Sequence, residues 1–152
     1  MLRLRDYLEP SCIRTDMAAG SKEAVIRSLV SVAEATGTVC DPAQLVADIL
    51  ERERLAPTGL GEACAIPHAH SSGVVDTRLV FCRLGSGVDF GAPDGQDARI
   101  VVLMVGPKDA AGLHLKLLSK LARLLHDPDY RSALMDAPDS DSLARLLYSK
   151  DD

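Results

Sequence analysis

Apolar residues recur every three or four positions in the first third of the chain, the spacing of a helix with one buried face. Ser21 is placed to cap the first of two predicted helices, and Gly37 to end it. The second helix is predicted from Asp41–Pro42, a start signal, to about Arg54, with Gln44 in the position of a capping box. The apolar positions of the two helices are Val25, Leu29, Val32 and Ala33, then Leu45, Ile49 and Leu50.

Leucines in the C-terminal third follow the same helical spacing. They predict a long amphipathic helix that ends at about His126. Asp127–Pro128 then starts a helix that runs to about Met135, and a last helix begins at about Asp139. The leucines that mark the first and last of these helices are Leu113, Leu117, Leu121, Leu124 and Leu125, then Leu143, Leu146 and Leu147.

Two segments between these helical regions have the composition of strands. Residues 78–84 predict one strand, and Asp94–Gly95 supplies a turn after it. Residues 100–105 are apolar without alternation, which is typical of a central strand covered by helices on both faces. Gly106–Pro107 ends this second strand.

The remaining segments are less regular. Residues 1–20 are expected to be irregular or to hold a short strand, and the prolines and glycines after residue 56 leave room only for an extended piece around residues 62–66. Helices and strands alternate without an internal repeat, so we expect a single α/β domain over residues 1–152. Its expected architecture is a three-layer α/β/α sandwich with a central, mixed, mostly parallel sheet of about five strands and helices on both faces.

Composition agrees with a single globular domain, because 47% of the 152 residues are hydrophobic and 26% are charged. A chain of this size buries about two-thirds of its unfolded surface, so it needs no metal or disulfide scaffold. The four cysteines are widely spaced and form no Cys-x-x-Cys pair, which predicts reduced thiols in a cytosolic protein.

Charge and aromatic content exclude other classes. A net charge of −5 argues against a nucleic-acid-binding protein, and five aromatic residues leave little for base stacking. The N-terminus lacks the apolar core of a signal peptide, and no apolar run approaches the roughly 20 residues of a membrane helix. We therefore expect a cytoplasmic protein without nucleic-acid binding or membrane insertion.

Candidate chemistry is concentrated in residues 52–70. Pro67 has a fixed φ angle and keeps the residue before it extended, so the imidazole of His68 is presented in a defined direction. An exposed histidine is largely neutral in the cytosol, and neutral imidazole is a nucleophile toward a phosphoryl group. The guanidinium of Arg52 and the hydroxyl of Thr58 are candidate donors to the oxygens of a phosphoryl group.

His114 lies in the first turn of the leucine-rich helix, where its ring can leave the apolar stripe and the helix N-terminus favours an anion. Taken singly, these histidines, Arg52 and Thr58 are more often ordinary surface residues than ligands. Gly59 and Gly61 do not begin a dinucleotide fingerprint, because Cys64 occupies the third glycine position and the segment follows a helix. Without further context, the two glycines are equally explained by a turn.

The whole pattern resembles the enzyme IIA domains of the fructose/mannitol class of the bacterial phosphotransferase system, over nearly the full chain. Within that class it is most similar to the stand-alone nitrogen-regulatory branch, because no fused IIB domain or permease follows in this sequence. The shared motifs are Arg52–Glu53, Thr58–Gly59–Leu60–Gly61, Ala65–Ile66–Pro67–His68, Val88–Asp89–Phe90, Asp94, Gly106–Pro107 and His114–Leu115.

The resemblance implies that His68 accepts a phosphoryl group through Nε2 and that His114 orients it. Arg52, Thr58, Gly59 and Gly61 are then expected to line the phosphate pocket, without metal or cofactor. The implied donor is a phosphorylated histidine carrier similar to HPr, charged from phosphoenolpyruvate through enzyme I. The implied activity is a phosphohistidine relay that acts as a nitrogen or metabolic regulatory switch on target proteins.

Other functions remain open at this point. A sugar-specific IIA subunit passes the phosphoryl group to a IIB domain, whereas a pure interaction module transfers nothing onward. A metal-binding protein could use Cys64, His68, His70 and His114 as ligands. Ala63 and Ala69 stand where the class commonly has glycine, and Pro57 where serine is common; these departures bear on partner identity.

Overall fold

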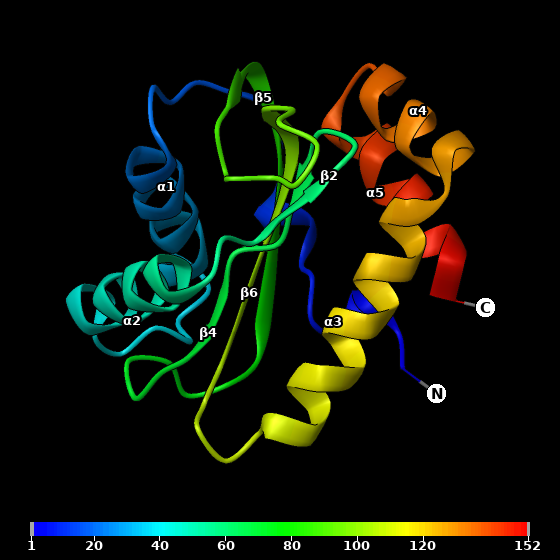
Figure 1. The fold of residues 1–152 in the computed structure, drawn as a ribbon. Helices are drawn as coiled ribbons and strands as arrows, with labels where there is room; N and C mark the ends of the chain where they lie inside the picture. The colour runs from blue at the N-terminus through cyan, green and yellow to red at the C-terminus, as the bar shows by residue number, and fades with distance from the viewer. Residues whose placement is uncertain (1, 152) are drawn as a thin grey trace.

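The computed structural model describes residues 2–151, in which a single sheet lies between two groups of helices (Figure 1). The strands are β1 (Ile13–Met17), β2 (Gly59–Gly61), β3 (Cys64–Ala65), β4 (His68–His70), β5 (Arg78–Val88) and β6 (Ala98–Gly106). The helices are α1 (Lys22–Glu34), α2 (Pro42–Leu55), α3 (Ala111–His126), α4 (Pro128–Asp136) and α5 (Ser140–Tyr148). Short 3₁₀ helices cover Leu4–Asp6, Pro10–Cys12 and Ser149–Asp151.

The sheet is mixed, with strand order β1-β5-β6-β3-β2, and β4 also pairs with β6. The pairs β1–β5, β3–β6 and β4–β6 are parallel, whereas β5–β6 and β2–β3 are antiparallel. The expected α/β sandwich with a mixed sheet is confirmed. The described sheet has six strands rather than about five, because the short segments on either side of Pro67 pair separately with β6.

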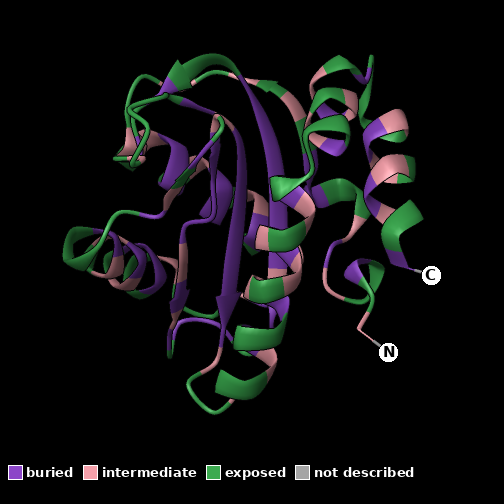
Figure 2. Ribbon diagram, turned by 45° about the vertical axis from the view of Figure 1, so that its right-hand side comes forward, coloured by how far each residue is buried: buried purple, intermediate pink, exposed green. Residues whose placement is uncertain are grey.

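Helices cover both faces of this sheet. α1 and α2 lie on one face, and α3, α4 and α5 lie on the other (Figure 1). β6 is buried along its whole length except at the half-buried Arg99, and Figure 2 shows the helices with one buried and one exposed face. The apolar run at residues 100–105 is therefore the centre of the core, as its lack of alternation predicts. No helix in residues 2–151 is long and apolar enough to cross a bilayer.

The helix start signals in the sequence are confirmed in atomic detail. The side chain of Ser21 accepts a hydrogen bond from Ala24 N (3.1 Å), and that of Asp41 accepts one from Gln44 N (3.1 Å). In a complete capping box the Gln44 side chain would also accept from the Asp41 N–H. Here the Asp41 N–H donates to the carbonyl of Gly73 instead, and the Gln44 side-chain amide donates to Asp48.

The expected extended piece at residues 62–66 is wrong at its start. Glu62 and Ala63 have φ angles of +56° and +62° and form the turn that joins β2 to β3. Asp94 accepts a hydrogen bond from Glu62 N (2.8 Å), and the Ala63 carbonyl accepts from the backbone of Arg99 and Ile100. These bonds hold two residues in a left-handed conformation that glycine adopts with less strain, at a position where the related class commonly has glycine.

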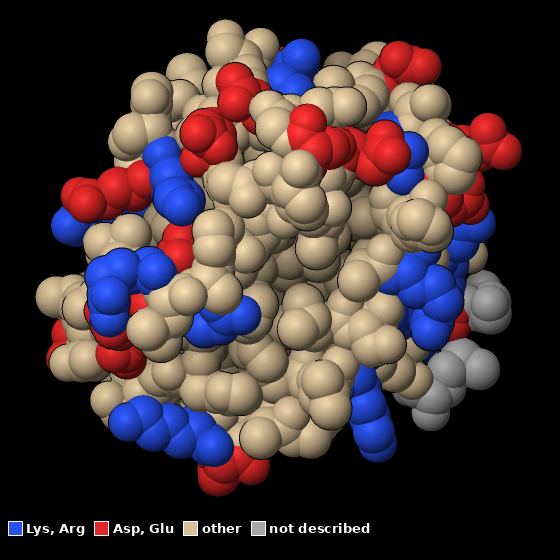
Figure 3. Space-filling model, viewed as in Figure 1, with Lys and Arg blue, Asp and Glu red and all other residues tan. Residues whose placement is uncertain are grey.

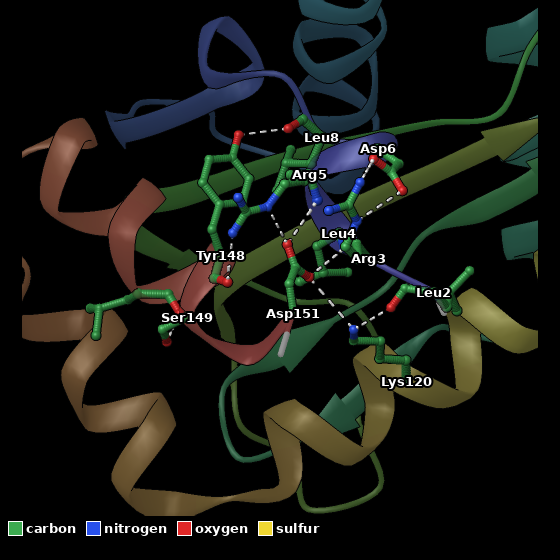
Figure 4. Close-up of polar contacts among 11 residues, drawn as sticks. Leu2, Arg3, Leu4, Arg5, Asp6, Leu8, Lys120, Tyr148, Ser149 and Asp151 are labelled. Carbon is green, nitrogen blue, oxygen red and sulfur yellow. Dashed lines mark hydrogen bonds and ion pairs between the residues drawn. The ribbon is translucent and has the colours of Figure 1, made fainter.

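The two ends of the described chain are joined by one buried carboxylate. Asp151 accepts hydrogen bonds from Leu4 N (2.6 Å) and Arg5 Nε (3.0 Å), and Lys120 of α3 lies 3.6 Å away (Figure 4). Tyr148 donates to the carbonyl of Leu8 (2.7 Å) in the same cluster. These contacts fix α3 and α5 against the N-terminal segment.

A second polar contact crosses the core from the sheet. Arg83 of β5 is only 7% exposed, and its Nη1 donates to three carbonyls at the end of α4. Those acceptors are Leu134 O (2.9 Å), Met135 O (3.1 Å) and Ala137 O (2.7 Å). The guanidinium thus satisfies the unpaired carbonyls of a helix C-terminus and interacts favourably with its dipole.

We expect Arg83→Met to lower the free energy of unfolding by about 2–3 kcal/mol, because the three buried carbonyls lose their donor while the side-chain volume is nearly kept. Urea denaturation measures the change. Arg123→Met, at an exposed position of α3, is the matched control and should stay within about 0.5 kcal/mol of the parent. Equal losses in the two variants would show that the carbonyl contacts of Arg83 contribute no stability.

Candidate functional site

Three histidines meet at the end of β4. Residues i and i+2 of a strand point to the same face, so His68 and His70 lie side by side. β4 runs parallel to the end of β6, where His70 is paired with Gly106. The His114 ring of α3 lies 5.4 Å from that of His68 and 4.0 Å from that of His70, centroid to centroid. The structure thus brings together the two histidines that the sequence analysis selects and adds a third.

The His68 ring is held by the backbone directly before it. Its Nδ1 lies 2.7 Å from the carbonyl oxygen of Ile66. A carbonyl can only accept, so we assign the proton to Nδ1, which leaves the Nε2 lone pair unprotonated. Pro67 lies between β3 and β4 and has no N–H to donate. Its carbonyl accepts from Met104 N of β6 (3.0 Å), so the register with β6 is kept up to His68.

His68 is half-buried, and burial is the main cause that lowers its pKa from the ordinary histidine value. The Ile66 hydrogen bond acts in the opposite direction, and the nearby Arg52 guanidinium lowers the pKa further. The ring is therefore neutral at neutral pH. A neutral, oriented imidazole with a free Nε2 is a competent nucleophile.

His114 differs from its expected setting. Its ring does not leave the apolar stripe for solvent but is only 5% exposed. Burial first, and then the neighbouring His70, His68 and Arg52, lower its pKa to about 4. A Cβ at Gly106 would lie 3.9 Å from His114 Nδ1 and 3.1 Å from Thr77 Oγ1, so the glycine that ends β6 also makes room for the ring.

Arg52 lies where it was expected, in the last turn of α2. It lines two hollows that meet at His68, of about 460 Å³ and about 310 Å³. Its Nη1 donates to the carbonyl of Ala56 (2.9 Å), which holds the side chain at the helix end while other guanidinium N–H groups remain available. Figure 3 shows uncharged side chains over the centre of this face, with charged groups around it. The side chains that line the larger hollow include Asp48, Leu55, Lys108 and all three histidines.

Thr58 lines the smaller hollow, but its hydroxyl is already engaged. Thr58 Oγ1 donates to Glu53 Oε1, and its backbone N donates to Glu53 Oε2 (2.9 Å). Glu53 is itself buried and also pairs with Lys22 at 3.3 Å. Thr58 and Glu53 therefore fasten the loop to α2, and the threonine shapes the pocket rather than offering a spare donor.

Gly59 and Gly61 line different hollows of the surface. Gly59 lines the smaller hollow, and a Cβ there would lie 2.8 Å from the backbone of Phe90 and Ala92, so only glycine fits. Gly61 lines a separate hollow beside His126 and packs against Asp94 with a φ angle of +91°. The structure does not bring Gly61 to the three histidines, because the chain turns away from them after Leu60.

Sequence reasoning considered His70 only as a metal ligand, did not select Lys108 and gave Glu53 no role of its own. Strand alternation from His68 was the signal for His70, but this segment was not predicted as a strand. The proposed four-ligand metal site does not form: no group of three or more His, Cys, Asp or Glu side chains within residues 2–151 is arranged to hold a metal ion. Cys64 is buried, which raises the pKa of its thiol to about 11, and its Sγ contacts the carbonyl of Glu62.

Two polar atoms in the cluster have no partner. His70 Nε2 and His114 Nδ1 are both buried and make no hydrogen bond to any described residue. An unsatisfied buried polar atom costs about 1–3 kcal/mol. Such atoms beside a nucleophile are an arrangement that a bound anion and its protons can satisfy.

Comparison with known proteins agrees with this geometry. Residues 6–150 match the family model described as "Phosphoenolpyruvate-dependent sugar phosphotransferase system, EIIA 2". The fructose-specific EIIABC component of Bacillus subtilis is 32% identical over 99% of this chain, which spans only 24% of that protein.

Two solved structures are similar as well. The nitrogen regulatory protein IIA-Ntr of Neisseria meningitidis has a TM-score of 0.87 and 32% identity, over 93% of this chain and 97% of that chain. The mannitol enzyme IIA of Escherichia coli, solved in complex with phosphorylated enzyme IIB, has a TM-score of 0.79 and 29% identity, over 92% of this chain and 96% of that chain.

The depressed pKa of His114 makes stability depend on pH. Its pKa is about 4 in the folded chain against an ordinary 6.5, so the unfolded chain binds the proton more tightly. The free energy of unfolding should fall as pH drops from about 7 to 4, by up to about 3 kcal/mol from this residue. His114→Gln should remove most of that slope in urea titrations at several pH values, and His68, whose pKa is also lowered, should account for part of the remainder.

His126→Gln is the control, since His126 is an exposed histidine at the end of the same helix. It should retain the parent slope. A His114→Gln protein with an unchanged slope would mean that the ring is protonated as easily in the folded chain as in the unfolded one.

Proposed function

The chain belongs to the EIIA 2 family of the phosphoenolpyruvate-dependent sugar phosphotransferase system, and we propose that His68 Nε2 is the atom that accepts its phosphoryl group. A phosphocarrier role follows from the family, whereas the identity of the acceptor rests on the site. The observation that carries it is the hydrogen bond from His68 Nδ1 to the Ile66 carbonyl. Residues 1–152 act as one domain in this proposal, and the cytoplasm is its place of action.

The transfer step is a displacement at phosphorus. The Nε2 lone pair of neutral His68 forms the new N–P bond while the bond from phosphorus to the donor's histidine breaks, and its electron pair returns to the donor's imidazole. No proton has to leave His68, because its proton already lies on Nδ1. The phosphorylated ring is then an imidazolium that still donates to Ile66.

The positive charge of the phosphorylated His68 ring also makes it easier to transfer the phosphoryl group to another molecule. An imidazolium nitrogen is a better leaving group than a nitrogen of a neutral ring, so the Ile66 contact keeps the phosphoryl group transferable. Two groups are placed to hold its oxygens: the Arg52 guanidinium, which lines both hollows, and the His114 ring across the pocket. The Thr58–Glu53 contact keeps the loop in position.

Partner proteins reach His68 across an apolar rim. Leu55 of α2 and Leu60 of β2 are 68% and 43% exposed and line the larger and the smaller hollow. Leu115, which follows His114 on α3, is 67% exposed. Large exposed apolar side chains next to a nucleophile fit docking of another protein. We assign this rim to a phosphorylated carrier similar to HPr, charged from phosphoenolpyruvate through enzyme I.

The favoured output is a nitrogen or metabolic regulatory switch, in which the phosphoryl group alters the binding of target proteins. Similarity to IIA-Ntr over 97% of that chain supports it. The second candidate is a sugar-specific subunit that passes the group to a IIB domain, which the likeness to the fructose component and to the mannitol IIA solved with phosphorylated IIB favours. Transfer of the phosphoryl group from this chain to a IIB domain distinguishes the two candidates. A sugar-specific relay passes the group on, whereas a regulatory switch or a pure interaction module transfers nothing onward.

We expect His68→Gln to abolish phosphorylation. The parent chain, incubated with phosphoenolpyruvate, enzyme I and a histidine carrier, should gain one phosphoryl group by intact mass, because His68 is the single proposed acceptor. His126→Gln should gain the same mass. A His68→Gln protein that still gains a phosphoryl group would place the acceptor elsewhere.

His114→Gln should keep the acceptor but slow transfer by roughly 10²-fold, since it removes one hydrogen-bond donor or acceptor to the transferring group. Rapid-quench kinetics with phosphorylated carrier measures the rate, with His126→Gln as the matched variant on the same helix. An unchanged single-turnover rate would remove His114 from the transfer step.

A further inference from the structure

His70 is the part of the cluster that the transfer step leaves without a role. Its ring packs against His114 at 4.0 Å between centroids, closer than His68 does, and its Nε2 is buried without a partner. His114 Nδ1, on the adjoining ring, is likewise buried and unpartnered. Two adjacent imidazole rings with unpaired buried nitrogens can gain a proton once a negative charge enters the pocket.

We propose that His70 is a positioning residue that forms an imidazole pair with His114, and that this pair takes up one proton from solvent when His68 is phosphorylated. The inference rests on the proposed function of His68 and extends it. Phosphorylation of this chain is then linked to pH through a residue that plays no part in forming or breaking the N–P bond.

The number of protons follows from the spacing of the rings. A phosphoryl group adds close to two negative charges to a pocket a few ångströms wide, which favours an imidazolium beside it. Two imidazolium rings 4.0 Å apart would repel each other strongly, so the pair holds one proton rather than two. His114 is 5% exposed and His70 is half-buried, so the positive charge is better solvated on His70.

Other charged groups face the pair, but they do not replace the proton. Asp48 and Glu51 of α2 line the same hollow as the pair. Asp48 already accepts from Ser71 (2.6 Å) and Gln44 (2.9 Å), and Glu51 already pairs with Arg54 at 2.6 Å. The fixed cations on this face are Arg52 of α2 and Lys108, which follows β6. His68, on β4 with His70, is the remaining titratable group beside the pair.

The pair also explains how His114 is kept in place. His114 Nδ1 has no hydrogen-bond partner among the described residues, so packing, including that against His70, orients the ring. The positive charge gained by the pair attracts the phosphoryl group across the pocket. His114 is then held more firmly after phosphorylation than before it.

Nuclear magnetic resonance of the histidine Cε1 signals tests the proposal on the full chain, which has four histidines. The signals are titrated from pH 3.5 to 9 before phosphorylation and from pH 6 to 9 after phosphorylation by phosphoenolpyruvate, enzyme I and a histidine carrier, with intact mass to confirm one added group. The titration midpoint of the His70 or His114 signal should rise by about one pH unit or more in the phosphorylated chain. The His126 signal should not move.

Two variants separate proton uptake from simple packing. In phosphorylated His70→Gln the rise should be lost and the lifetime of the phosphohistidine should no longer follow the pH profile of the parent. In His70→Lys a permanent positive charge replaces the gained proton. The phosphohistidine should then live as long as in the parent chain, but its lifetime should not depend on pH. His126→Gln should behave as the parent in both measurements.

Three outcomes overturn the proposal. A phosphorylated parent chain in which neither the His70 nor the His114 midpoint rises excludes proton uptake by the pair, and this result does not depend on any variant folding. An equal rise in His70→Gln excludes the role of His70 while leaving phosphorylation of His68 intact. A parent chain that gains no phosphoryl group at all overturns both this inference and the proposed function.

Discussion

One hydrogen bond within the chain, from His68 Nδ1 to the carbonyl of Ile66, sets the chemistry of the whole site. It fixes the tautomer, leaves the lone pair on Nε2 and would keep the ring cationic after the proposed phosphorylation. Pro67 lies between β3 and β4, and its carbonyl accepts from Met104 N, so the register with β6 continues across the proline. The Ile66 N–H donates to Thr58 rather than to β6, and the Ile66 carbonyl meets the His68 ring. The backbone directly before His68 is thus the structural basis of the proposed acceptor.

The surrounding fold keeps this ring neutral and accessible at once. Burial lowers the pKa of both His68 and His114, yet two hollows meet at His68 and leave a path for a partner. These conditions oppose each other, since a fully buried ring could not meet a carrier and a fully exposed ring would titrate at its ordinary pKa. β4 lies between α2 and α3 (Figure 1), and side chains of all three elements line the larger hollow beside His68.

The rigid parts of the molecule lie away from the chemistry. The antiparallel pair of β5 and β6 forms the buried centre, Arg83 ties the sheet to the end of α4, and Asp151 ties α3 to the N-terminal segment. α3 carries His114 near its N-terminal end and Lys120 two turns later, so the helix that positions the second imidazole is anchored at Asp151. Among the described residues, two of the four buried side-chain atoms without a hydrogen-bond partner lie in the histidine cluster, at His70 and His114; the other two are Arg78 Nε and Tyr130 Oη.

The sequence by itself determined the helices, their caps, the central strand and the choice of His68 as the proposed acceptor, because these depend on periodicity, capping side chains and a proline over a few residues. It also supplied the family, through short motifs at matching separations. Only the tertiary structure decided the burial of His114, the place of His70 beside it, the engagement of Thr58 by Glu53 and the distance of Gly61 from the rings. Those features depend on which residues of β4, α2 and α3 meet in space, and long-range packing leaves no local pattern in the chain.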